Sequence, residues 1–339
     1  MIIDVHNHYY PPAYLDALEK GPSAVRITRD AEGNPCVHYP GDYNVCVPGH
    51  HDIDYREQVL REGGIDTQLI SLTTPGTHVE EPRNAARLAA LVNDAFAQVV
   101  TDKRGRFAAL ATLPLNNPAA SVAEFRRATR ELKLPGAMLF SNVNGVALYD
   151  KRYWPLYEAA DEAGAVLMIH PTNPVGVEAM LEYWLMPLVG FLCDTTLAAA
   201  GLVFSGVAER FPRIRWLLGH LGGAIPYLAE RLDRGFEAFK ECRANIKQPP
   251  STYLKRWYYD PVNFDPRAIE LAIAFSGPDH ILAGSDYPHQ IGSIPRMLAS
   301  IRAVNAGDEA KRKILDENAM LLLKISPLRR ASDEELDST

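Results

Sequence analysis

The stretch Ile2-Ile3-Asp4-Val5-His6-Asn7-His8 places a short apolar run directly before two histidines that are separated by one residue. Alternate residues of a strand point to the same face, so His6 and His8 can both reach one metal ion. Two surface histidines near a chain end would give the same pattern, and an isolated HxH is frequent by chance. The motif on its own therefore supports a structural and a metal-binding interpretation equally.

Three other strand-like segments are also followed by a side chain that can bind a metal. His170, His220 and Asp286 each come at or just after the end of an apolar run. The carboxyl ends of the strands of an α/β barrel meet on one face, where such barrels place their active sites. Separate structural roles would require a private hydrogen-bond partner for each buried side chain, whereas one divalent cation satisfies most of them together. We therefore predict that these residues join His6 and His8 at one metal site.

Short apolar runs alternate with longer amphipathic segments along the chain, which is typical of repeated βα units around a parallel sheet. The expected strands are 2–5, 68–72, 107–113, 136–140, 166–169, 215–218, 257–259 and 280–283. The expected helices are 80–103, 118–132, 153–163, a long one within 179–209, 224–240, 266–275 and 308–323. Eight strands favour an α/β fold of the (β/α)8 TIM-barrel type over an open doubly wound sheet, which the pattern alone also allows.

The domain organisation follows from length and loop composition. We expect a single metal-dependent barrel domain over residues 1–325 of the 339-residue chain. The segment 11–51 after the first strand is rich in Gly, Pro, Tyr and Asn, and it is interpreted as an insertion over the barrel mouth because long ordered loops are usually functional. Residues 326–339 form a polar C-terminal tail that we expect to fray.

Composition excludes several classes of partner. The formal net charge is −7, so the chain lacks the basic surface that nucleic acids and anionic membranes require. The four cysteines, Cys36, Cys46, Cys193 and Cys242, have no CxxC spacing and predict a reducing cytoplasm. No basic leader precedes an apolar run, and the longest mostly apolar stretch, around 197–208, is too short to span a bilayer. We expect a soluble enzyme with a small-molecule substrate, neither nucleic acid nor membrane being a partner.

Several further motifs accompany the histidines and, together with them, extend over nearly the whole chain. They are DVHNH at 4–8, GIDTQLIS at 64–71, Tyr183-Trp184 followed by Leu188-Val189-Gly190, Asp194-Thr195-Thr196, GHLGGAIPY at 219–227 and GSDYP at 284–288. This set resembles the amidohydrolase superfamily, in particular its branch of 2-amino-3-carboxymuconate 6-semialdehyde decarboxylases. The motifs are specific for the family but not for one substrate.

The resemblance implies a role for each of the five residues. His6, His8, His170 and Asp286 would bind one divalent metal ion, with Zn²⁺ expected first and Mn²⁺ or Fe²⁺ also suited to nitrogen and oxygen ligands. His220 matches the catalytic histidine of the family, and an imidazole can carry a proton because its pKa lies near working pH. Asp286 would also take part in proton movement. A histidine on the fifth strand argues for one metal ion rather than two.

The substrate-binding residues depart from the family pattern. Val47 occupies the position at which, by the resemblance, the decarboxylase branch has an arginine that binds the substrate carboxylate. Arg231 matches a second carboxylate-binding arginine, which in the family reaches the substrate across a homodimer interface. The alternative interpretation, that Arg231 is an ordinary exposed arginine on a helix, has equal weight. His50, His51 and Arg56 are candidates to replace the missing charge, although each is more often a solvated loop residue.

Trp184 is expected to supply an aromatic wall for a planar substrate, although a tryptophan on a long helix more often serves packing. His289 lies soon after Asp286 in the sequence and either lines the pocket or faces solvent. The leading functional hypothesis is non-oxidative decarboxylation of an aromatic or unsaturated carboxylic acid. The alternative is hydrolysis or hydration by a metal-bound hydroxide at an ester, lactone, amide or ring bond. A non-catalytic metal-binding or partner-binding barrel is the third possibility and is disfavoured, because every expected ligand is retained.

Overall fold

The computed structural model describes residues 1–39 and 42–325, and its parallel strands form two sheets. The first sheet has the order β1 (Ile3–His8), β5 (Thr67–Ser71) and β6 (Phe107–Ala109). The second has the order β7 (Gly136–Phe140), β10 (Val166–His170), β11 (Arg215–Leu218) and β12 (Tyr258–Tyr259). Every residue of β1, β5, β7 and β10 is buried, as expected for parallel strands covered on both faces. The α/β class and the parallel arrangement are therefore as predicted.

Isolated parallel bridges connect the two sheets at both edges. They pair Ala111 with Ala137, Tyr259 with Ile281, Asp4 with Ala283, and Asn7 with Tyr287. The segment expected as the eighth strand, 280–283, thus lies extended between β12 and β1. It has no continuous ladder, because Ile281 and Ala283 pair with different neighbours. The backbone hydrogen bonds agree, since Leu282 donates to Tyr259 at 2.9 Å and Val5 donates to Ala283 at 2.8 Å.

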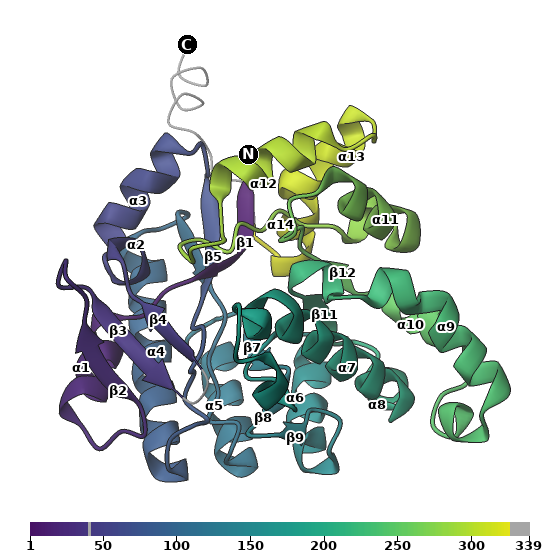
Figure 1. Cartoon of the computed structure of the whole chain (residues 1–339), viewed down its shortest axis with the longest axis horizontal. Helices are drawn as coiled ribbons and strands as arrows, with labels where there is room; N and C mark the ends of the chain where they lie inside the picture. The colour runs from purple at the N-terminus through teal and green to yellow at the C-terminus, as the bar shows by residue number, and fades with distance from the viewer. Residues whose placement is uncertain (40–41, 326–339) are drawn as a thin grey trace.

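The longer helices lie outside the strands, around the periphery of the molecule (Figure 1). They are α3 (Ile53–Glu62), α4 (Pro82–Asp102), α5 (Pro118–Arg130), α6 (Trp154–Ala163), α7 (Phe191–Phe204), α9 (Ile225–Ala238), α11 (Pro266–Ser276) and α12 (Ile294–Ala303). Helix ends follow capping chemistry: the side chain of Asp265 accepts a hydrogen bond from the Arg267 amide at the start of α11. Gly164 ends α6 with a φ of 55°, a left-handed conformation that glycine adopts without strain.

Shorter elements fill the connections between these strands and helices. They are α8 (Val207–Arg210), α10 (Pro250–Leu254), α13 (Asp308–Arg312), α14 (Asn318–Leu323), the hairpin β8 (Asn142–Val143) and β9 (Val146–Ala147), the 3-10 turns η1 (Lys151–Tyr153), η2 (Val177–Met180), η4 (His220–Gly222), η5 (Lys240–Arg243) and η6 (Pro278–His280), and the π-helical turns η3 (Met186–Gly190) and η7 (Lys313–Glu317). The helix expected over 308–323 is therefore continued through a π-helical turn.

The segment 11–51, in which the sequence shows little periodicity, contains regular structure. It holds α1 (Pro12–Lys20), an antiparallel sheet of β2 (Arg26–Arg29), β3 (Pro35–Tyr39) and β4 (Asp42–Val45), and α2 (Pro48–His51). The sheet lies beside α1 at one side of the molecule (Figure 1). Its strands have four or five residues, which is too short for a clear alternating pattern.

The long helix expected within 179–209 is broken. The turn η2, a bend at Tyr183 and Trp184, the π-helical turn η3 and α7 follow one another. Trp184 has a φ of 57°, so it lies in a left-handed turn and not on a long helix. The kink has a physical cause, because two successive non-glycine residues with positive φ cannot continue a right-handed helix.

The continuous helical run Met186–Phe204 corrects the expectation that every apolar stretch is too short for a bilayer. It has 19 residues and a mean hydropathy of 1.7, which meets the length and composition of a membrane span. A core helix of a water-soluble protein passes the same test, and 44% of this window is buried inside the protein. Asp194 in its middle accepts a hydrogen bond from Asn142 at 2.8 Å, which ties the helix to the hairpin of β8 and β9. The run is therefore weak evidence for a membrane partner.

Candidate metal centre

The carboxyl ends of the strands bring the predicted ligands together. The ring centroids of His6 and His8 are 5.1 Å apart, and that of His170 lies 5.3 Å from His6 and 4.6 Å from His8. Asp286 Oδ1 lies 3.5 Å from His6 Nε2 and 3.2 Å from His8 Nε2. Four side chains from three segments of the chain therefore meet in one place.

Two overlapping groups of ligand atoms satisfy the spacing of a metal site. One atom each from His6, His170, His220 and Asp286 lie within 4.8 Å of one another. The same holds for His8, Asp286 and His289. Asp286 belongs to both groups, so its carboxylate lies at the centre of the cluster.

Three atoms that face one another in this cluster lack hydrogen-bond partners within the described chain. Within the described chain, His6 Nε2, His8 Nε2 and Asp286 Oδ1 are buried and make no hydrogen bond. A buried polar group without a partner is destabilising, so three of them in contact require an explanation. Lone pairs of two imidazoles and one carboxylate oxygen that face one another form a suitable donor set for a divalent cation.

The protonation of His8 and His170 suits a metal, whereas His6 must lose a proton first. Burial lowers the pKa of His8 and of His170 well below the ordinary value, so both rings are neutral. Nδ1 of His170 lies 2.7 Å from the carbonyl oxygen of Pro171 and donates to it, which leaves Nε2 with its lone pair toward the cluster. Burial acts in the same direction on His6, but the carboxylates of Asp260, Asp286 and Asp4 outweigh it and raise the pKa of His6 to about 9.

Asp260 is a functional candidate that the sequence reasoning missed. Its Oδ2 lies 2.6 Å from Nδ1 of His6, and its Oδ1 accepts a hydrogen bond from the backbone amide of His220 at 2.9 Å. Asp260 directly follows β12, so it carries the same signal, a polar residue at the end of a strand, that identified His170 and Asp286. One buried carboxylate therefore orients two histidines of the cluster.

Glycine permits the close approach of these strands. A Cβ atom at Gly284 would lie 2.8 Å from Cβ of Asp260 and 2.9 Å from Cβ of His6, which is too close for any side chain. Asp286 follows with a φ of 56°, and its amide donates to the carbonyl oxygen of His6 at 2.8 Å. The left-handed turn and the glycine together direct the Asp286 carboxylate toward the histidines.

His220 lies at the edge of the cluster in a strained turn. It is buried, has a φ of 56°, and its ring centroid lies 4.9 Å from that of His6. Its Nδ1 makes no hydrogen bond within the described chain. Burial and the neighbouring His6 lower the pKa of His220. The neutral ring is thus able either to bind a cation or to carry a proton at this place.

A cavity of about 670 Å³ opens onto the cluster. Its lining includes His170, His220 and Asp286 together with a wall that is mostly aromatic and aliphatic. The aromatic residues of this wall are Tyr39, Tyr43, Trp184, Phe191 and Phe264. The rings of Tyr43 and Trp184 lie 5.9 Å apart. The segment 11–51 therefore contributes to the cavity through Tyr39, Tyr43, Asn44, Val45, Val47 and His50.

Only some of the predicted substrate-binding residues line the cavity. Trp184 lines the cavity, whereas Arg231 is exposed on α9 and lies outside the described lining. His51 is half-buried and also lies outside this lining, which does not support the prediction that it binds substrate. The physical reason is that successive residues of a helical turn face different directions, and in α2 it is His50 that lines the cavity. His289 lines it as well.

Arg56 is not a solvated loop residue and is not free to hold a substrate. It is fully buried, and its Nη1 donates to the carbonyl oxygens of His8 and Gly49, each at 2.7 Å. Its Nη2 and Nε donate to Asn7 Oδ1 and Gln68 Oε1, also at 2.7 Å. The guanidinium therefore ties α2 to β1, next to the metal cluster.

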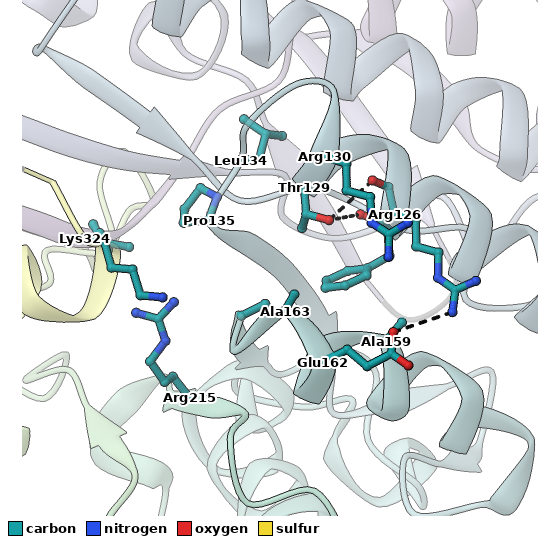
Figure 2. Close-up of a pocket in the computed structure, with 13 residues that line it drawn as sticks. Arg126, Thr129, Arg130, Leu134, Pro135, Ala159, Glu162, Ala163, Arg215 and Lys324 are labelled. Atoms are coloured by element: carbon teal, nitrogen blue, oxygen red, sulfur yellow. Dashed lines mark hydrogen bonds and ion pairs between the residues drawn. The ribbon is translucent and has the colours of Figure 1, made fainter.

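A second cavity, of about 400 Å³, lies near the amino ends of β7, β10 and β11 (Figure 2). Its lining includes Arg126, Arg130, Arg215 and Lys324, and Arg126 pairs with Glu162 at 3.9 Å. The described lining has no histidine, cysteine or aspartate. We therefore assign the active site to the cavity that opens onto the histidines.

A family profile described as amidohydrolase matches residues 3–325. The chain belongs to the amidohydrolase family. The 2-amino-3-carboxymuconate-6-semialdehyde decarboxylase of Dictyostelium discoideum is 33% identical to this amidohydrolase over 281 residues, which cover 81% of this chain and 77% of the relative. The 6-methylsalicylic acid decarboxylase of Penicillium expansum is 28% identical over 328 residues, 95% of each chain.

A solved structure also resembles this amidohydrolase. The 5-carboxyvanillate decarboxylase of Sphingomonas paucimobilis superposes with a TM-score of 0.84 and 26% identity, over 96% of this chain and 99% of that one. The family and branch expected from the motifs are thus confirmed. The expectation of an enzyme of the carboxy-lyase class is confirmed too, because these relatives are named as decarboxylases.

Proposed function

We propose that this amidohydrolase is a metal-dependent, non-oxidative decarboxylase that acts on an aromatic or unsaturated carboxylic acid. The observation that carries the proposal is a cavity of about 670 Å³ whose wall is largely apolar and whose polar groups include His170, His220 and Asp286. A planar ring fits such a wall, while a carboxylate requires the polar cluster. The decarboxylases among the relatives support the same reaction.

His6, His8, His170 and Asp286 would hold one divalent ion. The unpartnered Nε2 atoms of His6 and His8 and the unpartnered Oδ1 of Asp286 support this ligand set. When bound, the ion would supply a Lewis acid that orients the substrate carboxylate and an adjacent oxygen. Zn²⁺ is proposed first because imidazole ligands predominate, with Mn²⁺ or Fe²⁺ as alternatives because one ligand is a carboxylate.

His220 would deliver a proton to the carbon that bears the carboxylate. The bond between that carbon and the carboxylate then breaks, CO₂ leaves, and the electron pair returns to the ring. The net change is replacement of the carboxylate by one hydrogen. The proton consumed comes from solvent, and Asp286, which lies beside His220 in the cluster, would relay it from water back to that ring. The Asp260 contact to the His220 amide would hold the turn that carries the ring.

Trp184, Phe191 and Phe264 would bind the ring of the substrate and exclude water from it. Removal of water strengthens every electrostatic interaction between the substrate and the polar cluster. Hydrolysis by the same cluster is the alternative, but no contact in the cavity specifically favours it.

We propose that two copies associate through the surface formed by η3, α7 and α9. Large apolar side chains are exposed there: Tyr183 is 81% accessible, Tyr227 is 79% accessible and Leu197 is 63% accessible. Contiguous exposed apolar side chains mark interaction surfaces. Arg231 lies one helical turn after Tyr227 on α9, so a homodimer would place this arginine at the interface, where it would reach the substrate carboxylate of the partner.

The bridges at both edges of the two sheets support closure into a (β/α)8 barrel, which we propose as the architecture of a single domain over residues 1–325. The segment 11–51 would be an insertion at its mouth. The predicted tail, 326–339, lies outside the described residues. Free thiols at Cys36, Cys46, Cys193 and Cys242 support the proposal of a reducing cytoplasm.

A paired assay tests the proposed function. Metal-loaded protein would be supplied with hydroxybenzoic and unsaturated acids, and CO₂ release would be measured together with loss of the acid. Esters, lactones and amides of the same ring systems would be supplied in parallel. Release of CO₂ that is abolished by chelation and restored by a divalent metal supports the proposal, whereas metal-dependent hydrolysis alone would reject it.

A further inference from the structure

His50 is a buried polar residue that the proposed reaction does not use. It is 2% accessible and lines the cavity, yet Nδ1 and Nε2 both lack a hydrogen-bond partner within the described chain. An imidazole deprived of both partners is unfavourable unless a ligand or water supplies them. The position therefore points to a group of the substrate.

The backbone around His50 is held firmly. The Tyr10 amide donates to the carbonyl oxygen of His50 at 2.7 Å, and the His50 amide donates to that of Val47, also at 2.7 Å. Arg56 holds the carbonyl oxygen of the preceding residue, Gly49. The ring is thus positioned in advance, which is a condition for selective recognition.

His289 connects His50 to the metal cluster. The ring centroid of His289 lies 5.2 Å from that of His50 and 4.8 Å from that of His8. Nε2 of His289 lies 3.4 Å from Oγ1 of Thr73, another cavity residue. The wall beside the cluster therefore carries imidazoles and a hydroxyl, which are groups that can both donate and accept hydrogen bonds.

Among the described residues, this wall carries no buried cation. Val47, an apolar residue near His50, also lines the cavity. Among the described lining residues Arg296 is the only arginine or lysine, and it is exposed at the first turn of α12. Burial, together with His289 and Arg56, lowers the pKa of His50 well below its ordinary value, so this ring is neutral as well. A carboxylate at this wall would be buried without a partner charge, whereas a hydroxyl would satisfy one nitrogen of His50 as a neutral partner.

We infer that His50 is a specificity-determining residue that binds a ring hydroxyl of the substrate, so that the substrate class is a hydroxylated aromatic monocarboxylic acid and not a dicarboxylic acid. This inference rests on the proposed decarboxylase function. The single carboxylate lies at the metal cluster, the ring lies against the aromatic wall, and the hydroxyl lies between His50 and His289. Thr73 completes the polar wall.

The test uses salicylates in which one ring position carries hydrogen, hydroxyl or carboxylate, with each position examined in turn. Metal-loaded wild-type protein is compared with His50→Phe, which removes both nitrogens, and His50→Gln, which keeps a donor and an acceptor. His280→Phe is the matched control, because His280 lies on η6 outside the described lining. Val47→Arg introduces a cation at the wall of the cavity. The readouts are kcat/KM for CO₂ release and the dissociation constants of the corresponding phenols, which cannot lose CO₂, by calorimetry.

At one ring position, hydroxyl should exceed hydrogen by about tenfold or more in kcat/KM, and carboxylate should fall below hydrogen. His50→Phe should abolish the hydroxyl advantage and leave the hydrogen compound within about threefold, while His50→Gln should keep part of the advantage. Val47→Arg should raise kcat/KM for the dicarboxylate. The phenols should show the same pattern in binding.

Two results would overturn the inference while leaving the proposed reaction intact. One is a higher kcat/KM of wild-type protein for the dicarboxylate than for the hydroxyl compound. The other is an equal effect of His50→Phe on the hydrogen, hydroxyl and carboxylate compounds. If no acid releases CO₂, the proposed function fails, and the phenol dissociation constants still decide whether His50 recognises a hydroxyl. If His50→Phe is unfolded by circular dichroism, His50→Gln and Val47→Arg carry the decision.

Discussion

Oδ2 of Asp260 lies 2.6 Å from Nδ1 of His6, and both side chains are fully buried. This pair connects the end of β12, the seventh of the parallel strands, to the first, β1. A carboxylate that holds the remote nitrogen of a ligating imidazole fixes the orientation of the ring and increases its basicity. The metal site therefore depends on a residue that does not belong to the proposed ligand set.

Asp260→Asn should weaken metal binding by about tenfold or more. A hydrogen bond from a metal-binding histidine to a neighbouring carboxylate typically contributes about 10- to 100-fold to metal affinity. Competition with a chromogenic chelator would measure the loss. Asp265→Asn offers a control, since Asp265 is half-buried, caps α11 and is not a member of the cluster. Equal metal affinity of wild type and Asp260→Asn would contradict the role of Asp260.

The same pair predicts how metal binding depends on pH. Asp260 contributes to a pKa of His6 of about 9, so below this pH the metal-free protein carries a proton that a metal must displace. Affinity should therefore fall by about tenfold per pH unit as the pH drops below 9, and should level off above it. His8 and His170 add no further pH dependence to the metal affinity in this range, because burial keeps both rings neutral. Calorimetry in buffers of different ionisation enthalpy should show release of about one proton at pH 7 in wild type and close to none in Asp260→Asn.

His220→Asn should retain the metal and lose activity by about 100-fold or more, because a positioned acid or base contributes roughly 10²- to 10⁴-fold to a rate. Metal content by mass spectrometry and CO₂ release would be measured on the same sample. Loss of metal together with activity would instead assign His220 to the ligand set. Near-normal turnover with metal bound would exclude His220 as the proton carrier.

Arg56→Met should destabilise the protein by about 3 kcal/mol or more, because four buried acceptors would lose their donor. Urea unfolding would measure the change in the free energy of unfolding. Arg61→Met on the same helix, α3, provides the comparison, since Arg61 is exposed and pairs with Glu57 one helical turn away. Its effect should be within about 0.5 kcal/mol. Similar effects of the two substitutions would refute the structural role of Arg56.

Arg231→Ala tests the proposed interface between two copies. Arg231 is exposed on α9, so its removal should leave the thermal stability of a single copy unchanged but raise KM at least tenfold, since charged hydrogen bonds contribute about 1.5–3 kcal/mol. Arg234→Ala is a control on the same helix, where Arg234 pairs locally with Glu237. Sedimentation would establish whether two copies associate. A monomer with wild-type KM in Arg231→Ala would contradict the proposal.

Much of this fold follows from the sequence, because parallel strands buried on both faces appear as uninterrupted apolar runs. β7 and β11 begin and end at the predicted residues. The segment 280–283 was expected as a strand and forms only bridges, since its pairing alternates between two neighbours. The antiparallel sheet of segment 11–51 was not predicted, because strands of four or five residues carry little periodicity.

The residues of the candidate site were likewise predicted only in part. His6, His170 and Asp286 were recognised because each follows an apolar run, and Asp260, which follows β12 in the same manner, was overlooked. The orientations of His50, His51 and Arg56 depend on how α2 and α3 pack against β1, which no local pattern encodes. Sequence therefore predicts residues at strand ends better than residues that reach the cavity from loops.

The decisive measurement is the fate of the substrate carbon in heavy water. Metal-loaded protein in D₂O would be supplied with a salicylate labelled with ¹³C in the carboxylate, and the products would be analysed by mass spectrometry and NMR. The proposed reaction predicts ¹³CO₂ and one deuterium at the former carboxylate position for each turnover, with neither formed in metal-stripped protein. Retention of the labelled carboxylate across the hydroxybenzoic and unsaturated acids, with water oxygen appearing in a product from an ester, lactone or amide, would contradict it.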